Sequence, residues 1–476
     1  MRTKSMTVKN GELYIGDFSL SELSARYRTP LYVYDEEGII EKINIFKEYF
    51  RSDKFATEIV YASKAFLAPY LCKILAGRDI SIDAVSVGDL HLIEKSGFPN
   101  NRILLHGNNK SNGELEKAVE MGVEYVVVDS YTELARLKDL SEKKEKHINT
   151  LFRINPGIYA DTHAYIETSL LSSKFGESIH DEEIIDKVVD IYRRAKYLRL
   201  DGFHCHIGSQ INNPKSFIAA AQTMLNFTKR FAQKYGMEVD VLNLGGGFAI
   251  KYLENDAEVD LRWVLTEIIK TVESRVEKYG LKLKKLMIEP GRALVGDSGF
   301  TLYRVGLLKK TFGGKKYIFI DGGMSDNIRP ALYQAKFTVE VANRVAEPDD
   351  DSDPYPSFNF YDVVGKCCES ADIIAEAVNI DEVRIGDIIV VYATGAYCYS
   401  MSMNYNGLQR GAVIFVKGDK ITEAIRRQSL DDLVATCDFG VTECKFLICI
   451  TIFFMIFISK RKKASKDALP RITGSS

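Results

Sequence analysis

Two segments of the sequence carry side chains suited to covalent or acid–base chemistry. Lys64 follows an apolar run, in Tyr-Ala-Ser-Lys-Ala, and a lysine that loses water beside a buried strand becomes an imine-forming nucleophile. The alternative is a solvated lysine at the start of a helix. The turn Glu289-Pro-Gly291-Arg292 holds a carboxylate and a guanidinium together. One interpretation is a simple ion pair between the two side chains. The other is a site in which the carboxylate faces a ring nitrogen and the arginine faces an anion.

Two histidines lie two residues apart in the segment Gly202-Phe-His-Cys-His-Ile-Gly-Ser209. On a strand, His204 and His206 share one face, which permits a metal pair, but no third ligand is evident nearby. His204 also fits a buried, hydrogen-bonded core position. His206 is one step from a loop and suits stacking on a planar ring, while Ser209 follows a flexible glycine and suits an anion.

Glycines and cysteines mark two further places. The segment Asn243-Leu-Gly-Gly246-Gly247 lacks the spacing of a dinucleotide-binding loop and the lysine of a P-loop. It is either a tight turn or a set of backbone N–H groups for a phosphate. Cys367, Cys368 and Glu369 set thiols beside an acid, and adjacent cysteines rarely close a disulfide because the ring is strained. The alternative is a pair of half-buried cysteines.

Taken together, these groups are typical of one kind of cofactor site. A lysine for an imine, a carboxylate for a pyridinium nitrogen, a stacking histidine and a glycine-rich phosphate cradle describe a site for pyridoxal 5'-phosphate. The combination is much more specific than any single member, and the sequence predicts this cofactor and no metal.

The elements that must position these groups follow an alternating pattern. Short, apolar, β-branched runs alternate with candidate helices, which predicts βαβ units, a parallel sheet and an α/β fold with a (β/α)8 barrel. The helices include 112–121, opened by a capping box of Ser111 and Glu114, and 181–197. The eight runs are 58–61, 80–85, 103–106, 125–129, 151–154, 202–206, 241–244 and 286–289. Groups able to do chemistry end or follow most of them, namely Lys64, Asp83, His106, Asp129, Asn155, His206, Gly245–Gly247, and Glu289 with Arg292.

The pattern changes after residue 293. The runs 302–308, 317–320, 388–393 and 412–416 predict strands without long helices between them, and 12–14 and 31–34 are also β-like. We therefore expect a barrel domain at 36–294, a mainly β domain from 6–35 and 295–438, and a tail at 439–476.

Composition narrows the class of protein. The chain has 476 residues, and 63 Lys and Arg against 65 Asp and Glu give a formal charge of −2, which argues against a basic nucleic-acid surface. The eight cysteines form no C-x-x-C pair, which argues against zinc ribbons and secreted disulfide scaffolds. The N-terminus lacks the apolar region of a signal peptide, so we expect a cytoplasmic protein.

The tail contains an apolar run at 446–458, followed by four basic residues. It is shorter than the ~18 residues that a membrane-spanning helix needs. A marginal tail anchor, a partner- or membrane-surface element, and a segment without a functional role are the three interpretations, and we favour the last.

The chain resembles the diaminopimelate decarboxylases, among the alanine racemase-like (fold type III) pyridoxal phosphate enzymes, over about residues 10 to 438. The motifs that carry the resemblance are Tyr-Ala-Ser-Lys64-Ala, His106-Gly-Asn-Asn-Lys-Ser111, His-Cys-His206-Ile-Gly-Ser-Gln, Gly-Gly-Gly247-Phe, Glu289-Pro-Gly-Arg292, Asn327-Ile-Arg-Pro-Ala-Leu-Tyr333, Cys368-Glu-Ser, Gly395-Ala-Tyr397 and Asn404-Tyr-Asn406. Departures from the pattern are Phe66, Lys366 and Cys398, where the family usually has Asn, Pro and Gly.

The resemblance implies a role for each matching residue. Lys64 binds the cofactor as an imine, His206 stacks on its ring, and Glu289 keeps the ring nitrogen protonated. Cys368 donates a proton and, with Glu369, comes from a partner subunit, which implies a homodimer with shared active sites. The residues implied around the phosphate or nearby substrate groups are Ser209, Gly246, Gly247, Gly291, Arg292 and Tyr397. Arg329 and Tyr333 are implied for the carboxylate of the substrate's second head, and Glu369 is implied to bind the substrate.

The implied reaction is decarboxylation of meso-2,6-diaminopimelate to L-lysine, the last step of lysine biosynthesis. Ornithine, arginine or a carboxylated polyamine are alternative substrates, but they lack the second carboxylate that Arg329 and Tyr333 would bind. A non-catalytic regulator is disfavoured by the presence of Lys64, Glu289 and Cys368 together, and the adjacent Cys368 and Glu369 disfavour a racemase.

Overall fold

The computed structural model describes residues 1–158, 173–345, 359–380 and 382–438. Residues Met1–Gln428 form one compact unit. The chain from Ser429 belongs to a second unit, whose described part holds the short helix α12 (Leu430–Val434). The apolar run at 446–458 lies outside the described residues. No helix in the described part of the chain is long and apolar enough to cross a membrane.

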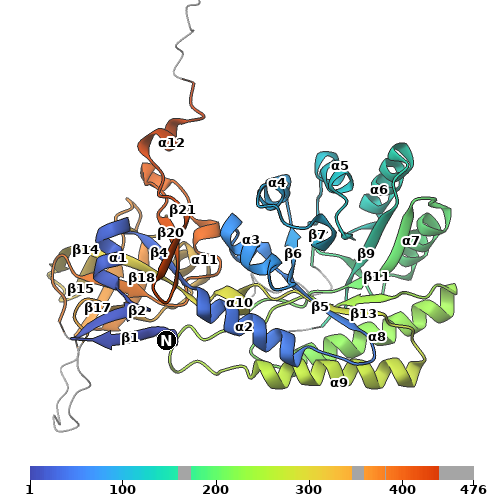
Figure 1. Ribbon diagram of the computed structural model, residues 1–476, viewed down its shortest axis with the longest axis horizontal. Coiled ribbons are helices and arrows are strands. Elements are labelled where there is room, and N and C mark those ends of the chain that lie inside the picture. Colours follow the sequence, from blue (N-terminus) through green and yellow to red (C-terminus); the bar gives the residue numbers. More distant parts are fainter. Residues whose placement is uncertain (159–172, 346–358, 381, 439–476) are drawn as a thin grey trace, which may run out of the picture. The chain divides into compact units, whose positions relative to one another are not determined.

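Eight parallel strands close into a barrel within the first unit, and each coincides with a predicted run (Figure 1). Closure comes from β13 pairing with β5 and from β8 pairing with β9. Most residues of these strands are buried, as expected where both faces of the sheet are covered. The strands are β5 (Ala56–Tyr61), β6 (Ser81–Ala84), β7 (Ile103–Leu105), β8 (Tyr125–Val128), β9 (Ile148–Asn155), β11 (Leu198–His204), β12 (Val241–Asn243) and β13 (Lys285–Ile288), with the short β10 (Glu177–Ser178) beside β9.

Helices separate successive barrel strands. The predicted capping box of Ser111 and Glu114 is confirmed at the start of α5. The prediction of a helix over 181–197 was too long, because Asp181 is the N-cap of α7 and the chain turns extended at Ala195 to enter β11. The helices are α3 (Pro69–Ala76), α4 (Val87–Lys95), α5 (Asn112–Met121), α6 (Tyr131–Lys144), α7 (Glu182–Arg194), α8 (Lys215–Tyr235) and α9 (Leu261–Tyr279).

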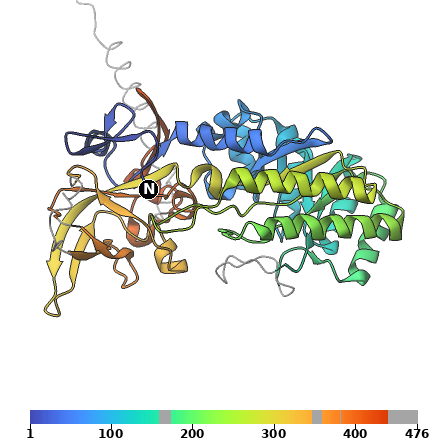
Figure 2. The same ribbon diagram turned by 90° about the horizontal axis from the view of Figure 1, so that it is seen from below.

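The outer ring of helices is completed from the N-terminal side. Only the four-residue α10 (Arg292–Val295) follows β13, so no long helix is available after the last barrel strand. Instead α2 (Glu36–Tyr49), which precedes β5, packs against α9, and α9 packs against α8 (Figure 2).

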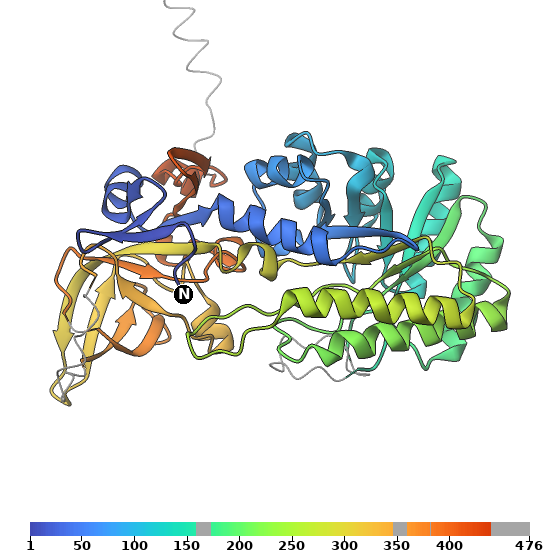
Figure 3. The same cartoon turned by 60° about the horizontal axis from the view of Figure 1, so that its bottom comes forward.

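A second sheet is built from both ends of the chain. Its central strand β4 (Leu31–Asp35) pairs antiparallel with β14 (Gly299–Lys310) and parallel with β20 (Ala412–Lys417) (Figure 3). The predicted strands at 302–308, 317–320, 388–393 and 412–416 are confirmed. The other members are β15 (Lys316–Ile320), β16 (Val339–Val341), β17 (Phe360–Val364), β18 (Ile373–Asn379), β19 (Ile388–Val391) and β21 (Lys420–Ile425).

The first thirty residues form a small sheet with its own helix. Strands β1 (Met6–Lys9), β2 (Glu12–Ile15) and β3 (Phe18–Ser19) pair in order, and α1 (Leu20–Tyr27) follows. Their apolar side chains share one buried cluster with the second sheet, as predicted; its members include Leu13, Ile15, Leu20, Leu23, Val33, Phe300, Leu302 and Ile414.

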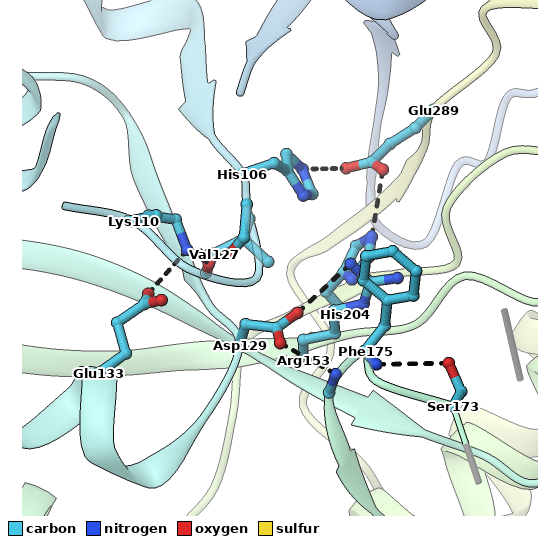
Figure 4. Close-up of polar contacts among 12 residues, drawn as sticks. His106, Lys110, Val127, Asp129, Glu133, Arg153, Ser173, Phe175, His204 and Glu289 are labelled. Atoms are coloured by element: carbon cyan, nitrogen blue, oxygen red, sulfur yellow. Dashed lines mark hydrogen bonds and ion pairs between the residues drawn. The ribbon is translucent and has the colours of Figure 1, made fainter. Parts of the chain in front are cut away.

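A fully buried lysine fixes the loop between β7 and α5. The Nζ of Lys110 donates to the Gly107 carbonyl at 2.7 Å, to the Val127 carbonyl at 2.6 Å and to Oε1 of Glu133 at 2.7 Å (Figure 4). All three ammonium protons are thereby used. The loop that begins with His106 is therefore tied to β8 and α6.

Replacing Lys110 by methionine should lower the free energy of unfolding by roughly 3 to 5 kcal/mol, because the Glu133 carboxylate would stay buried without a cation. Urea unfolding of both proteins measures the change. The matched control is Lys117→Met, which removes a more exposed pair with Glu94 and should change the free energy by less than about 1 kcal/mol. Equal losses in the two variants would contradict the role given to Lys110.

Candidate active site

Lys64 lies at the carboxyl end of β5, in the single turn Ser63–Ala65. The Ser63 N–H donates to Oδ1 of Asp83 on β6 at 2.6 Å, and the Ala65 carbonyl accepts from the Tyr397 N–H at 2.8 Å. Ser63 and Ala65 are buried, whereas Lys64 is exposed. The turn is therefore held on both sides while the Lys64 amine stays accessible.

Glu289, the residue after β13, is a buried carboxylate with three hydrogen-bond donors. Its Oε1 lies 2.8 Å from Nε2 of His106, and its Oε2 lies 3.1 Å from Nε2 of His204 (Figure 4). Oε1 also lies 2.8 Å from Nδ2 of Asn243. Burial alone would raise the Glu289 pKa, but His106 and His204 outweigh burial and hold the pKa well below its ordinary value. Glu289 is therefore an anion.

These contacts also resolve the two interpretations of His204. The ring is buried and bonded to Glu289, as expected for a hydrogen-bonded core histidine. Atoms of ligand type in His106, His204 and Glu289 lie within 4.8 Å of one another, and hydrogen bonds join them.

His206 follows β11 and faces the glycine loop. Its Nδ1 accepts a hydrogen bond from the Gly246 N–H at 3.2 Å, so its ring proton resides on Nε2. Burial, together with the charges of Lys64 and Arg153, holds the His206 pKa well below its ordinary value. The ring is therefore neutral.

The glycine loop Gly245–Gly247 has features of both a tight turn and a phosphate-binding loop, the two alternatives for its sequence. A Cβ on Gly246 would lie 1.9 Å from the Glu289 carbonyl oxygen, and one on Gly247, at φ +114°, would lie 2.3 Å from the Gly208 carbonyl. The Gly246 N–H is used by His206. Among the described residues, the Gly247 N–H forms no hydrogen bond. The loop is thus a tight turn that still offers one N–H group to a ligand.

Arg292 opens α10 and connects several predicted residues. Its Nη2 donates to Oγ of Ser209 at 3.0 Å, and its Nη1 donates to the hydroxyl of Tyr252. Its guanidinium lies 4.7 Å from the centre of the Tyr397 ring. The Nε atom is buried and has no hydrogen-bond partner among the described residues. Arg292 therefore retains a donor for an anion.

Arg329 and Tyr333 bound the one-turn helix α11 (Arg329–Tyr333). The Arg329 guanidinium lies 5.1 Å from the centre of the Tyr333 ring, so both side chains face the same side. It also lies 5.5 Å from the Tyr397 ring, so it neighbours Arg292 through that tyrosine. Both residues line a cavity of about 320 Å³, together with Tyr252. The buried Nε of Arg329 has no hydrogen-bond partner among the described residues.

The cysteine pair lies apart from these groups. Cys367 is buried and Cys368 is exposed, and both are free thiols. The Cys368 N–H donates to Oδ1 of Asn406 at 2.8 Å. In the described part of a single chain, no hydrogen bond, ion pair or ring contact joins Cys368 or Glu369 to Lys64.

The chain is similar to known proteins in both sequence and structure. Residues 36–296 match the pyridoxal-binding domain of the pyridoxal-dependent decarboxylases. The chain is 40% identical over 426 residues to the diaminopimelate decarboxylase of Bacillus subtilis, covering 90% of this chain and 95% of the relative. It is 39% identical over 433 residues to that of Staphylococcus aureus, covering 90% and 99%. The chain belongs to the pyridoxal-dependent decarboxylase family.

The solved structures support the same assignment. The diaminopimelate decarboxylase of M. jannaschii in complex with L-lysine superposes on this decarboxylase with a TM-score of 0.82 at 28% identity. The superposition covers 91% of this chain and 98% of that one. The fold is therefore the alanine racemase-like barrel with a second, mainly β domain.

The cofactor of this decarboxylase is pyridoxal 5'-phosphate, and the groups at the barrel mouth fit it. Lys64 offers an accessible amine, and Glu289 offers an anion for a pyridinium nitrogen. The Nε of Arg292 and the N–H of Gly247, which have no hydrogen-bond partner within the described ranges, suit phosphate oxygens.

Some contributors to the site were missed by sequence reasoning. Asn243 and His106 lie within recognised motifs, but nothing in the sequence shows that both bond to Glu289. Tyr252 bonds to Arg292 and lines the cavity, yet it lies in an irregular loop without periodicity. Arg153 lies on β9 with its side chain 3.4 Å from Asp129, and only its inward position on the strand could have indicated it.

Acid should destabilise this decarboxylase because His204 and His206 bind protons less readily in the folded chain than in the unfolded chain. Burial lowers the His204 pKa to about 4 from 6.5, so between these values the unfolded chain binds a proton that the folded chain does not. The stabilisation is complete above about pH 6.5 and falls as the pH drops, approaching roughly 3 kcal/mol of loss near pH 4.

Urea unfolding at a series of pH values from 7.5 to 4.5 measures this dependence. The low pKa values of His206 and Glu289 act in the same direction. The variant His204→Gln should give a shallower dependence, because it lacks one of the titrating groups. An unchanged slope would show that His204 does not contribute.

Proposed function

We propose that this chain decarboxylates meso-2,6-diaminopimelate to L-lysine and CO2, the last step of lysine biosynthesis. The observation that carries the proposal is the buried Arg329, which lines a cavity together with Tyr252, the partner of Arg292. Its Nε has no hydrogen-bond partner in the part of the chain that the structure describes. A cation there matches a substrate with a second carboxylate. Relatives that carry the name diaminopimelate decarboxylase, one of them solved with L-lysine, support the same substrate.

We propose the following division of labour at the cofactor. Lys64 binds it covalently, the neutral His206 ring stacks on the pyridine ring, and Glu289 faces the ring nitrogen. The bound cofactor supplies an electron sink for the carbanion that forms when CO2 leaves. The groups around its phosphate or nearby substrate atoms are Ser209, Gly246, Gly247, Gly291, Arg292 and Tyr397.

The other residues bind and orient the substrate. Arg329 and Tyr333 hold the carboxylate of the second head, and Arg292 and Tyr397 face the reacting head. Cys368 delivers the proton that replaces CO2, and Glu369 binds the substrate. Together these groups would exclude water and orient the scissile bond for the reaction.

The proposal includes a homodimer. Cys368 is exposed, and within the described residues of its own chain no hydrogen bond, ion pair or ring contact joins it to Lys64, so we assign it, with Glu369, to the site of the partner subunit. We also propose two domains, a barrel at 36–294 and a mainly β domain from 6–35 and 295–438. The tail at 439–476 is proposed to have no role in catalysis. The proposed location of the protein is the cytoplasm. The free thiols of the described cysteines support that location.

Turnover and the attachment site test the reaction. The enzyme with pyridoxal phosphate should release CO2 and L-lysine in equal amounts from diaminopimelate, and Lys64→Ala should abolish this turnover. Borohydride reduction followed by peptide mass spectrometry should find the cofactor on Lys64. The control Lys73→Ala, at an exposed site on α3, should remain active. Cofactor trapped on another lysine would refute the assignment.

Replacing Cys368 by alanine should lower kcat by roughly 10²-fold or more with little change in cofactor binding, because a proton donor acts in the transition state. The matched variant is Cys367→Ala at the buried neighbour. A large loss of kcat in that variant alone would mean that the other thiol is the donor.

The same variant tests the shared site. Mixing inactive Lys64→Ala with inactive Cys368→Ala should restore part of the activity, because one site of each hybrid dimer is intact. Isotope-labelled subunits prove the exchange. No recovery after proven exchange would place Cys368 in the site of its own chain.

The variant Arg329→Leu should raise KM for diaminopimelate by an amount worth roughly 2 to 5 kcal/mol, since the substrate carboxylate would lose its cation in a desolvated site. Cofactor absorbance should stay nearly unchanged. Loss of the cofactor with an unaltered KM in the remaining holoenzyme would assign Arg329 to the cofactor instead.

A further inference from the structure

The Glu289 carboxylate accepts hydrogen bonds from several side chains. Three side chains from three different strand ends bond to it: His106 after β7, His204 at the end of β11 and Asn243 at the end of β12. All four residues are buried. The two histidine rings also pack edge to face, with their centres 4.9 Å apart.

The protonation states of this group follow from its geometry. An ionised carboxylate only accepts hydrogen bonds, so each facing nitrogen must carry a proton. In His204 the proton is therefore on Nε2, and the buried Nδ1 has no partner among the described residues. The single hydrogen bond that orients this ring is thus the one to Glu289.

A carboxylate that faces a pyridine nitrogen shares one proton with it. The proton resides either on the ring nitrogen, which leaves an anionic carboxylate, or on the carboxylate, which leaves a neutral ring. Donors to the carboxylate stabilise only its anionic form. Each hydrogen bond to a charged group contributes roughly a ten- to hundred-fold bias in this equilibrium.

We propose that His106 and His204 are positioning residues that keep the shared proton on the ring nitrogen of the cofactor and off Glu289. The inference rests on the proposed contact between Glu289 and that nitrogen. Only the protonated ring is a strong electron sink, so the two histidines act on the reaction without touching the substrate. Lys110 contributes indirectly, because it holds the Gly107 carbonyl next to His106.

The test measures the position of the proton and not only the activity. Enzyme loaded with ring-¹⁵N pyridoxal phosphate is examined by ¹⁵N NMR, in which protonated and neutral pyridine nitrogens have well-separated shifts. Wild type should give the protonated shift. His106→Leu and His204→Leu should each move the signal toward the neutral position, and kcat should fall roughly ten- to hundred-fold.

Conservative variants separate hydrogen bonding from packing. His106→Gln and His204→Gln retain a side-chain N–H near the position of Nε2, so they should keep most of the protonated signal and of kcat. The exposed His91 on α4 supplies the control His91→Leu, which should change neither. If the Leu and Gln variants both keep the wild-type shift, the proposal is wrong.

One further variant tests the premise separately. Glu289→Gln removes the anion and should give a neutral ring nitrogen. If the Glu289→Gln enzyme keeps the protonated signal, Glu289 does not face the nitrogen, and the proposed arrangement of the site fails. If it loses the signal while both Leu variants keep it, the site stands and the role of the histidines fails.

Discussion

A carboxylate that must remain ionised while buried is the constraint on which the barrel mouth depends. Glu289 meets it through donors that follow or end three other strands, and no single βα unit could supply them. Parallel pairing brings these strand ends to one rim, and each donor then needs its own support. For His106 that support is the buried Lys110, whose three protons hold the loop in place.

The second sheet is part of the same site. Tyr397 and Ser400 both donate to the Ala65 carbonyl, beside Lys64, and the Tyr34 hydroxyl donates to the Gly395 carbonyl. Arg292 belongs to the barrel, yet it lies over the ring of Tyr397. The turn that carries Lys64 is therefore fixed from two directions, by Asp83 within the barrel and by a loop from the other sheet.

The barrel strands and a helix cap could be predicted from short sequence patterns. All eight barrel runs and the capping box at Ser111 were confirmed, because apolar runs and caps are properties of short segments. Strands β16, β17, β18 and β21 escaped prediction, since they are short or rich in exposed residues. The grouping of His106 with Glu289 joins residues remote in sequence and could only come from the closed barrel. Tyr252 carried no pattern at all.

The position of β4 in the middle of the second sheet has a consequence for synthesis on the ribosome. Residues Leu31–Asp35 are buried on every side, but their partners begin at Gly299 and Ala412. At bacterial or eukaryotic elongation rates of about 5–20 residues per second, this apolar strand leaves the exit tunnel tens of seconds before its first partner. All barrel strands are therefore synthesised after β4 and before either of its sheet partners, β14 and β20. A chain that ended before Ala412 would keep β14 but lack β20, so one edge of β4 would stay unpaired, and chaperones and proteases recognise such an exposed edge.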